Sequence, residues 1–208
     1  MKYHFITVEG NIGAGKTTLA KQLAEYYNAA LLLEQFAENP FLPLFYQDKE
    51  KYALPLELSF LKDRYQQLQS SLKEFQDKQE LIVADYTILK SPLFAKNNLN
   101  EAEFKLFCDI HDMMKTTLPK PDLFIYLHTP VERLQRHIKK RGRSYEQNIS
   151  ARYLMEIEDA YLQYFKQHPD NVLWLDNTTV DFNEPQYFNQ LTKYIESEGS
   201  LPEGILTF

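Results

Sequence analysis

Short, almost continuous apolar segments alternate along this chain with longer segments in which apolar residues recur every three or four positions. The short segments are typical of strands buried on both faces of a sheet. They predict strands at about 3–8, 29–33, 80–84, 122–127 and 172–175. The longer segments predict helices at about 16–27, 54–75, 100–117, 130–140, 150–167 and 184–197. This alternation indicates an α/β fold, a five-stranded parallel sheet flanked by helices.

The helical period is clearest over 54–75, where the apolar positions are Leu54, Leu58, Leu61, Tyr65, Leu68, Leu72 and Phe75. We find no internal repeat, low-complexity tract or long linker in the 208 residues. We therefore expect residues 1–208 to form a single domain, since this length suits one domain of ordinary size.

A glycine-rich segment lies between the first predicted strand and the first predicted helix. Its residues are Gly10, Asn11, Ile12, Gly13, Ala14, Gly15, Lys16 and Thr17, followed by Thr18. They match the phosphate-binding loop G-x-x-x-x-G-K-[ST], in which backbone N–H groups cradle phosphates, the Lys reaches the β/γ-phosphates and the hydroxyl meets Mg²⁺. The sequence thus predicts a nucleoside triphosphate site with a metal position at Thr17.

Composition restricts the class of protein. The net charge of −6 argues against a nucleic-acid partner, which usually needs a basic surface. No apolar run is long enough to span a bilayer, and the N-terminus lacks the apolar region of a signal peptide. The single cysteine, Cys108, excludes an intramolecular disulfide and a cysteine-based metal site, and we expect it to be a buried structural thiol. A cytoplasmic protein without a membrane partner is expected.

A carboxylate, Glu34, follows the second predicted strand. At the carboxyl edge of the sheet it would face the γ-phosphate and could take a proton from a hydroxyl acceptor. The alternative is an ordinary solvated side chain. From Glu34 to Gln47 the chain has no Lys or Arg, whereas an acceptor that carried a phosphate would call for one. The pattern favours catalysis by Glu34 on a neutral acceptor.

Two further features suit the chemistry of phosphates. Asp85 ends the third predicted strand and is placed to serve Mg²⁺ directly or through water, or else to cap the next helix. Arg141, Gly142 and Arg143 end a basic segment that could close as a lid, at about 137–147, over the transferring phosphoryl group. Basic residues that complement a helix dipole are the alternative, but they do not explain cations beyond the helix end.

Taken together, these segments resemble the deoxynucleoside kinases, a family that includes deoxycytidine and deoxyguanosine kinases and their bacterial relatives. The resemblance covers nearly the whole chain. The matching segments are EGNIGAGKTT (9–18), Glu34, NPFLP (39–43), the helix with Arg64, FA (94–95), TPxE (129–132), RGRxxEQ (141–147) and LDN…DF (175–182).

The resemblance implies a P-loop kinase, usually a homodimer, that uses ATP and Mg²⁺ to phosphorylate the 5′-hydroxyl of a deoxynucleoside. It implies that Glu34 is the base, that Tyr46 and Glu146 hold the 3′-hydroxyl, and that Arg141 and Arg143 bind the phosphates. Phe94 matches an aromatic residue that stacks on the nucleobase. Asp176, Asp181 and Phe182 match the loop around the donor adenine. Core packing is the alternative for Tyr46 and Phe94.

The chain departs from the family at two places. Asp85-Tyr86-Thr87 replaces an acidic-Arg-Ser triplet, so only the acid transfers. Glu57 replaces a Gln seven residues before Arg64, and Lys90 stands near the position of an acid. A carboxylate only accepts hydrogen bonds, so Glu57 with Arg64 and Lys90 suits either purine, although pyrimidines are not excluded. A structural ion pair of Glu57 with Lys90 or Arg64 is the alternative.

We therefore expect an ATP- and Mg²⁺-dependent deoxynucleoside kinase that favours deoxyadenosine or deoxyguanosine. A nucleoside monophosphate kinase, such as a thymidylate kinase, is the alternative enzyme, and the absence of cations after Glu34 argues against it. A GTP-dependent switch is the alternative outside the kinases. Such a switch would carry an Asn-Lys-x-Asp guanine signature, which this chain lacks.

Overall fold

A computed structural model of the chain describes residues 2–35, 39–77, 80–169, 171–182, 184–197 and 205–206. Its sheet contains six parallel strands in the order β2-β3-β1-β4-β5-β6. The strands are β1 (Phe5–Gly10), β2 (Ala30–Leu32), β3 (Ile82–Ala84), β4 (Leu123–His128), β5 (Val172–Asp176) and β6 (Ile205–Leu206). The five predicted strands are confirmed. The short edge strand β6 was not predicted from the sequence.

The helices are α1 (Lys16–Tyr26), α2 (Phe41–Gln47), α3 (Lys49–Asp77), α4 (Lys90–Asn98), α5 (Glu101–Lys115), α6 (Val131–Arg141), the 3₁₀ helix η1 (Ser144–Glu146), α7 (Ala151–Gln167) and α8 (Pro185–Glu196). The six predicted helices are confirmed. The pattern did not reveal α2 and α4, because both are short and each carries an internal proline, Pro43 or Pro92. The longest helix, α3, begins before the predicted start and includes Pro55.

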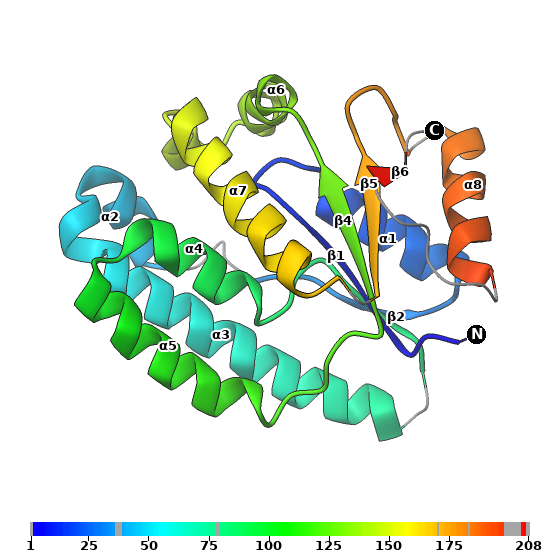
Figure 1. Ribbon diagram of the computed structural model, residues 1–208, viewed down its shortest axis with the longest axis horizontal. Coiled ribbons are helices and arrows are strands. Elements are labelled where there is room, and N and C mark those ends of the chain that lie inside the picture. Colours follow the sequence, from blue (N-terminus) through cyan, green and yellow to red (C-terminus); the bar gives the residue numbers. More distant parts are fainter. Residues whose placement is uncertain are drawn as a thin grey trace.

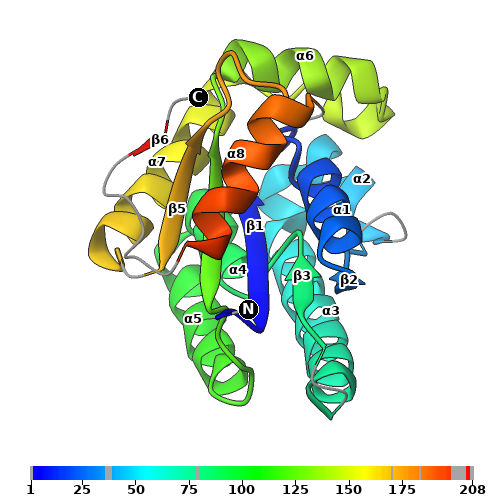
Figure 2. The ribbon, with the colours of Figure 1, turned by 90° about the vertical axis from the view of Figure 1, so that its right-hand side faces the viewer.

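Helices cover both faces of the sheet (Figure 1). α1 and α8 lie on one face, and α3, α4, α5 and α7 lie on the other (Figures 1 and 2). Alternate residues of β1 serve the two sides: Ile6 and Val8 join the core under α1, and Phe5 joins the core under α3. All six residues of β1 are buried, as its central position requires.

The strand order places a ligand-binding edge beside the glycine-rich loop. β1 lies between β3 and β4. The helix that follows β1 covers one face of the sheet, whereas those that follow β3 cover the other. Such a reversal opens a crevice at the carboxyl ends of the two strands, where α/β proteins bind ligands. The residues after Gly10 and the residues after Ala84 therefore meet at one place.

Two side chains that the sequence predicts to be buried, Leu31 and Cys108, are partly exposed. Leu31 in β2 is 37% exposed, because β2 forms the edge of the sheet and lacks cover on that side. Cys108 is half-buried on α5, where the neighbouring Phe107 is the side chain that enters the core. Among the described helices, none has the length and apolar character that a membrane span requires.

Candidate active site

The loop between β1 and α1 depends on glycine at the points where the backbone turns. Gly13 and Gly15 have φ angles of 83° and 97°, a region that other residues rarely adopt. A Cβ atom at Gly13 would lie 3.0 Å from the carbonyl oxygen of Leu134 and 3.2 Å from Cγ1 of Ile138. Both neighbours belong to α6, which packs against the loop. His137 of the same helix approaches the carbonyl oxygen of Gly13 to 2.7 Å.

Lys16, the first residue of α1, folds back over this loop. Its Nζ donates a hydrogen bond of 2.8 Å to the carbonyl oxygen of Asn11. Burial and the nearby cation of Lys90 lower the pKa of Lys16 to about 8, against the opposing attraction of Glu9. An incoming phosphate would favour the charged ammonium, because opposite charges in a poorly solvated site attract strongly. A bound phosphate would therefore raise the pKa of Lys16 and favour its charged form.

A cavity of about 660 Å³ opens beside the loop. Its lining includes the predicted ATP-binding residues Gly13, Ala14, Gly15, Lys16, Thr17, Thr18, Asp181 and Phe182, and the predicted lid residues Arg141 and Arg143. Gly10, Asn11 and Asp176 lie outside this lining, and Ile12 lines a second cavity. The carboxylate of Asp176 instead accepts a hydrogen bond of 2.8 Å from the backbone N–H of Thr178.

The second cavity has a volume of about 120 Å³ and is lined by every residue predicted to bind the nucleoside. These residues are Glu34, Tyr46, Glu57, Arg64, Asp85, Lys90, Phe94 and Glu146. Five residues line both cavities: Gly13, Lys16, Thr17, Arg141 and Arg143. The two cavities therefore meet at the phosphate-binding loop and the basic end of α6, which is the arrangement that transfer between two bound molecules requires.

Glu34 lies at the centre of a buried charge cluster. Arg64 contacts its Oε1 with Nε at 2.8 Å and Nη2 at 2.7 Å, and Lys90 contacts its Oε2 at 2.5 Å. Burial alone would raise the pKa of Glu34, but the Lys90 and Arg64 cations hold it well below its usual range. The carboxylate is ionised at neutral pH and fixed on both oxygens. The structure therefore places Lys90 on the carboxylate predicted to be the base.

Thr17, in the first turn of α1, contacts Asp85, which directly follows β3. The hydroxyl of Thr17 donates to Oδ2 of Asp85 at 2.5 Å, and the backbone N–H of Glu34 donates to Oδ1 at 2.8 Å. Mg²⁺ binds one or two carboxylate or hydroxyl oxygens of a protein together with phosphates and water. This oxygen pair, open to the larger cavity through Thr17, fits such an ion.

The basic segment folds back onto Glu146. Arg141 and Arg143 both contact the carboxylate of Glu146, Arg143 at 3.2 Å, and Gly142 between them takes a left-handed conformation (φ 73°) that ends α6. Tyr145 stacks on Tyr46 with ring centroids 6.1 Å apart. This segment therefore contributes Arg141, Arg143 and Glu146 to the lining of the nucleoside cavity and brings its cations to the junction with the loop.

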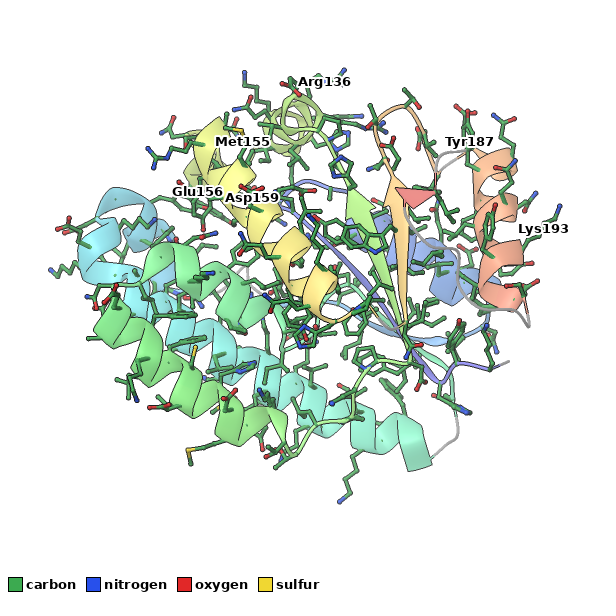
Figure 3. All side chains as sticks on the ribbon, in the orientation of Figure 1. Arg136, Met155, Glu156, Asp159, Tyr187 and Lys193 are labelled. Carbon is green, nitrogen blue, oxygen red and sulfur yellow. The ribbon has the colours of Figure 1, made fainter. Side chains whose placement is uncertain are left out.

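The cations of α6 have different partners, and Arg133 lines the larger cavity while it also holds the backbone of a neighbouring segment. Arg133 donates to the carbonyl oxygens of Thr178 at 2.9 Å and Val180 at 2.8 Å, which fixes the segment after β5. Arg136 is exposed and points away from the sheet (Figure 3). The basic pattern alone could not separate the cations that face phosphates from those that hold the fold.

Glu57 makes neither of the ion pairs considered from the sequence. Its Oε1 accepts a hydrogen bond of 2.6 Å from Asn98, whereas the Arg64 and Lys90 cations contact Glu34. Burial raises the pKa of Glu57, whereas the Asn98 hydrogen bond and these cations lower it. Burial has the larger effect, so the pKa is raised to about 7. Glu57 thus remains a buried acceptor in the nucleoside cavity.

Sequence reasoning missed several residues of the site. Asn98 and Tyr153 line the nucleoside cavity. Asn177 was not singled out within the segment 176–182 that matches the donor-adenine loop; it lines the larger cavity and donates to the carbonyl oxygen of Ala14 at 2.9 Å. Glu9 lines neither cavity, but it is fully buried, accepts from the backbone N–H of Thr87 and attracts the Lys16 cation. Asn98 follows Phe94 by four residues on α4, so only recognition of this segment as a helix would have placed the two on one face.

Comparisons with known proteins agree with this geometry. The family model for deoxynucleoside kinases matches residues 6–197. The chain is 34% identical to the deoxyguanosine kinase of Bacillus subtilis (strain 168) over 183 residues, which is 86% of this chain and 88% of that protein. It is 33% identical to the deoxyadenosine kinase of Lactobacillus acidophilus over 176 residues, 80% of each chain.

A solved structure has the same fold. The deoxyadenosine kinase from M. mycoides with bound dCTP superposes with a TM-score of 0.75 at 25% identity, covering 91% of this chain and 99% of that one. The family match extends from the first strand to the last described helix and includes both cavities. With these cavities, this loop and these relatives, the chain belongs to the deoxynucleoside kinase family.

Proposed function

We propose that this deoxynucleoside kinase transfers the γ-phosphoryl group of ATP, with Mg²⁺, to the 5′-hydroxyl of a purine deoxynucleoside. One observation carries the proposal: Lys16 and Thr17 line both cavities, and Glu34 lies in the second. A donor phosphate held by the loop would therefore adjoin a hydroxyl held by Glu34. The reaction needs little covalent help from the protein, because positioning and charge stabilisation dominate phosphoryl transfer.

On the donor side, the loop N–H groups and Lys16 bind the β- and γ-phosphates. Arg141 and Arg143, which line both cavities, stabilise the charge on the transferring group. Thr17 and Asp85 would hold Mg²⁺, which when bound neutralises charge shared between the phosphate oxygens. Asn177, Asp181 and Phe182 line the same cavity and would face the rest of the donor.

On the acceptor side, Glu34 accepts a hydrogen bond from the 5′-hydroxyl and takes its proton as the new bond forms. The Lys90 and Arg64 cations hold the pKa of Glu34 below its usual range, so the carboxylate is charged and able to accept this hydrogen bond at neutral pH. Arg64 and Lys90 keep the carboxylate oriented. Tyr46 and Glu146, across the cavity, would hold the 3′-hydroxyl, and Phe94 would pack on the base.

The purine preference rests on the acceptor character of Glu57. Its carboxylate faces the nucleoside cavity, and a purine offers N–H donors to it and ring acceptors to Arg64. The relatives from Bacillus subtilis and Lactobacillus acidophilus are both named as kinases of purine deoxynucleosides, which supports this preference.

We also propose a cytoplasmic homodimer in which residues 1–208 form one domain with a lid at about 137–147. Substrates of this kind and ATP occur together in the cytoplasm, and a single free cysteine suits a reducing compartment. Apolar side chains available to a partner helix include Met155 on α7 and Leu106 on α5, which are 49% and 50% exposed. Met155 projects from the outer side of α7 beside Glu156 and Asp159 (Figure 3).

A direct assay tests the activity and the preference together. The purified protein is incubated with ATP, Mg²⁺ and each of the four natural deoxynucleosides, and 5′-monophosphate is measured. We expect faster turnover of deoxyguanosine or deoxyadenosine than of either pyrimidine, and none when EDTA removes the metal. Lys16→Ala serves as the control and should be inactive but folded. Faster turnover of a pyrimidine would contradict the purine preference.

A further inference from the structure

Asn98 lines the nucleoside cavity, and its amide has one buried acceptor without a hydrogen-bond partner among the described residues. Its Nδ2 group donates to Oε1 of Glu57 at 2.6 Å and to the hydroxyl of Tyr153 at 3.1 Å. The ionised carboxylate of Glu57 can only accept, so it pairs with the Nδ2 side of this amide. The other atom, Oδ1, is buried and accepts no hydrogen bond from the part of the chain that the structure describes.

Buried polar atoms without a partner are uncommon, because burial removes the water that would otherwise bond to them. Asn98 lines the cavity next to Glu57, so a ligand is the natural source of a donor for Oδ1. Glu57 has a similar opening. Asn98 donates to its Oε1, and among the described residues no other side chain or backbone N–H donates to the Glu57 carboxylate. Two acceptors from neighbouring side chains therefore remain for one ligand.

The donors of the cavity lie elsewhere. Arg64 uses Nε and Nη2 on Glu34 and Nη1 on Ser91, and Lys90 contacts Glu34. A guanidinium carries five N–H donors, so Arg64 keeps some for a ligand. The cavity thus offers adjacent acceptors on Glu57 and Asn98 and donors on Arg64, and a base that matches must present the reverse pattern.

Guanine presents that pattern. Its N1–H and N2–H₂ groups are adjacent donors, and O6 and N7 are adjacent acceptors. Adenine carries an N6–H₂ donor in place of O6 and has no donor at position 2, so it leaves one acceptor of the pair unfilled. Resting on the proposed function, we propose that Asn98 determines specificity by accepting a hydrogen bond from the 2-amino group of guanine, while Glu57 accepts from N1–H.

Four deoxynucleosides separate the contributions of positions 2 and 6. Deoxyguanosine and 2,6-diaminopurine deoxyriboside carry the 2-amino group, whereas deoxyinosine and deoxyadenosine lack it. For the wild-type enzyme we expect kcat/KM to be at least about tenfold higher for deoxyguanosine than for deoxyinosine, the usual scale for a donor that fills a buried acceptor. Equal values for these two would overturn the inference, even if both are phosphorylated.

The variant Asn98→Ala tests the residue itself. We expect the advantage of the 2-amino group to fall by about tenfold in both pairs, deoxyguanosine against deoxyinosine and 2,6-diaminopurine deoxyriboside against deoxyadenosine. Asn97→Ala is the matched control, because Asn97 is the preceding residue and lies outside the cavity lining. It should keep the wild-type ratios. A uniform loss on all four substrates in Asn98→Ala would contradict the inference.

The wild-type comparison needs no variant, so it stands even if Asn98→Ala folds poorly. Different results would contradict the proposed function and the proposed role of Asn98. Absence of phosphorylation of any deoxynucleoside would contradict the proposed function. Phosphorylation with no response to the 2-amino group would contradict only the role of Asn98.

Discussion

The ammonium nitrogen of Lys90 lies 2.5 Å from Oε2 of Glu34, and Arg64 occupies the other oxygen of the same carboxylate. The three side chains come from α4, the segment after β2, and α3, and all are nearly inaccessible to solvent. Burial of a single carboxylate would favour its neutral form, but two cations keep it charged. Lys90 and Arg64 therefore determine both the charge and the orientation of the group proposed to receive the hydroxyl proton.

We predict that Lys90→Met lowers kcat about tenfold or more, because Glu34 loses one of the two contacts that orient it. Lys90→Arg, which keeps a cation, should recover part of the loss. If Lys90 acts through Glu34, the effects of Lys90→Met and Glu34→Gln will not add in the double variant. Additive effects in this cycle would indicate that Lys90 has a role independent of Glu34.

Gly13→Ala should destabilise the fold, because α6 leaves no space for a Cβ atom next to the loop. That atom would lie 3.0 Å from the carbonyl oxygen of Leu134 at a φ of 83°. Gly142→Ala is the control, since Gly142 has a similar φ of 73° and no atom within 4 Å of the added Cβ. We expect a larger fall in Tm for Gly13→Ala, measured without nucleotide. Equal falls would show that backbone strain alone matters.

Glu57 should make stability depend on pH. Its pKa is raised to about 7 in the folded protein from 4.5, so between these values the folded state binds more protons than the unfolded state. The free energy of unfolding contributed by Glu57 therefore falls as pH rises from about 4.5 to about 7. Glu57→Gln removes this contribution and keeps an acceptor for Asn98. The Tm of the variant relative to wild type should rise between pH 5 and pH 8.

Other groups titrate in both proteins and cancel in that difference, so thermal unfolding at the two pH values suffices. A constant Tm difference between pH 5 and pH 8 would mean that burial does not raise the pKa of Glu57 in the folded protein. The same variant also bears on specificity, because Gln both donates and accepts. Its activity on deoxycytidine and thymidine relative to the purines should increase.

Local pattern was enough to predict the loop and most of the sheet. The segment from Gly10 to Thr18 is contiguous, and each glycine in it answers a local backbone requirement. The charge neighbours of Glu34 were not predictable in this way. Arg64 and Lys90 lie 30 and 56 residues from it along the chain, so their contacts depend on how α3 and α4 pack. The sequence indicated Lys90 as a base-binding residue, and only the fold brings it to Glu34.

The pattern of apolar and polar residues also failed to predict the exposure of Leu31 and the helix α4. Leu31 looks like a core residue in sequence, because an apolar run does not tell whether its strand is central or at an edge. α4 has weak periodicity and contains Pro92, so it did not stand out as a helix. Its absence from the prediction hid Asn98, whose partner Glu57 lies 41 residues away on α3.

Turnover by Glu34→Gln tests the central claim most directly, because Gln keeps the shape and hydrogen-bonding capacity of the side chain but cannot take the hydroxyl proton. With saturating ATP and Mg²⁺, we predict that kcat for the best deoxynucleoside falls by about 100-fold or more, the usual scale for a positioned base. Deoxynucleoside affinity, measured by titration calorimetry, should stay near wild type. Glu50→Gln on the exposed start of α3 is the control and should retain full activity. A fall in kcat of less than tenfold for Glu34→Gln would contradict the account.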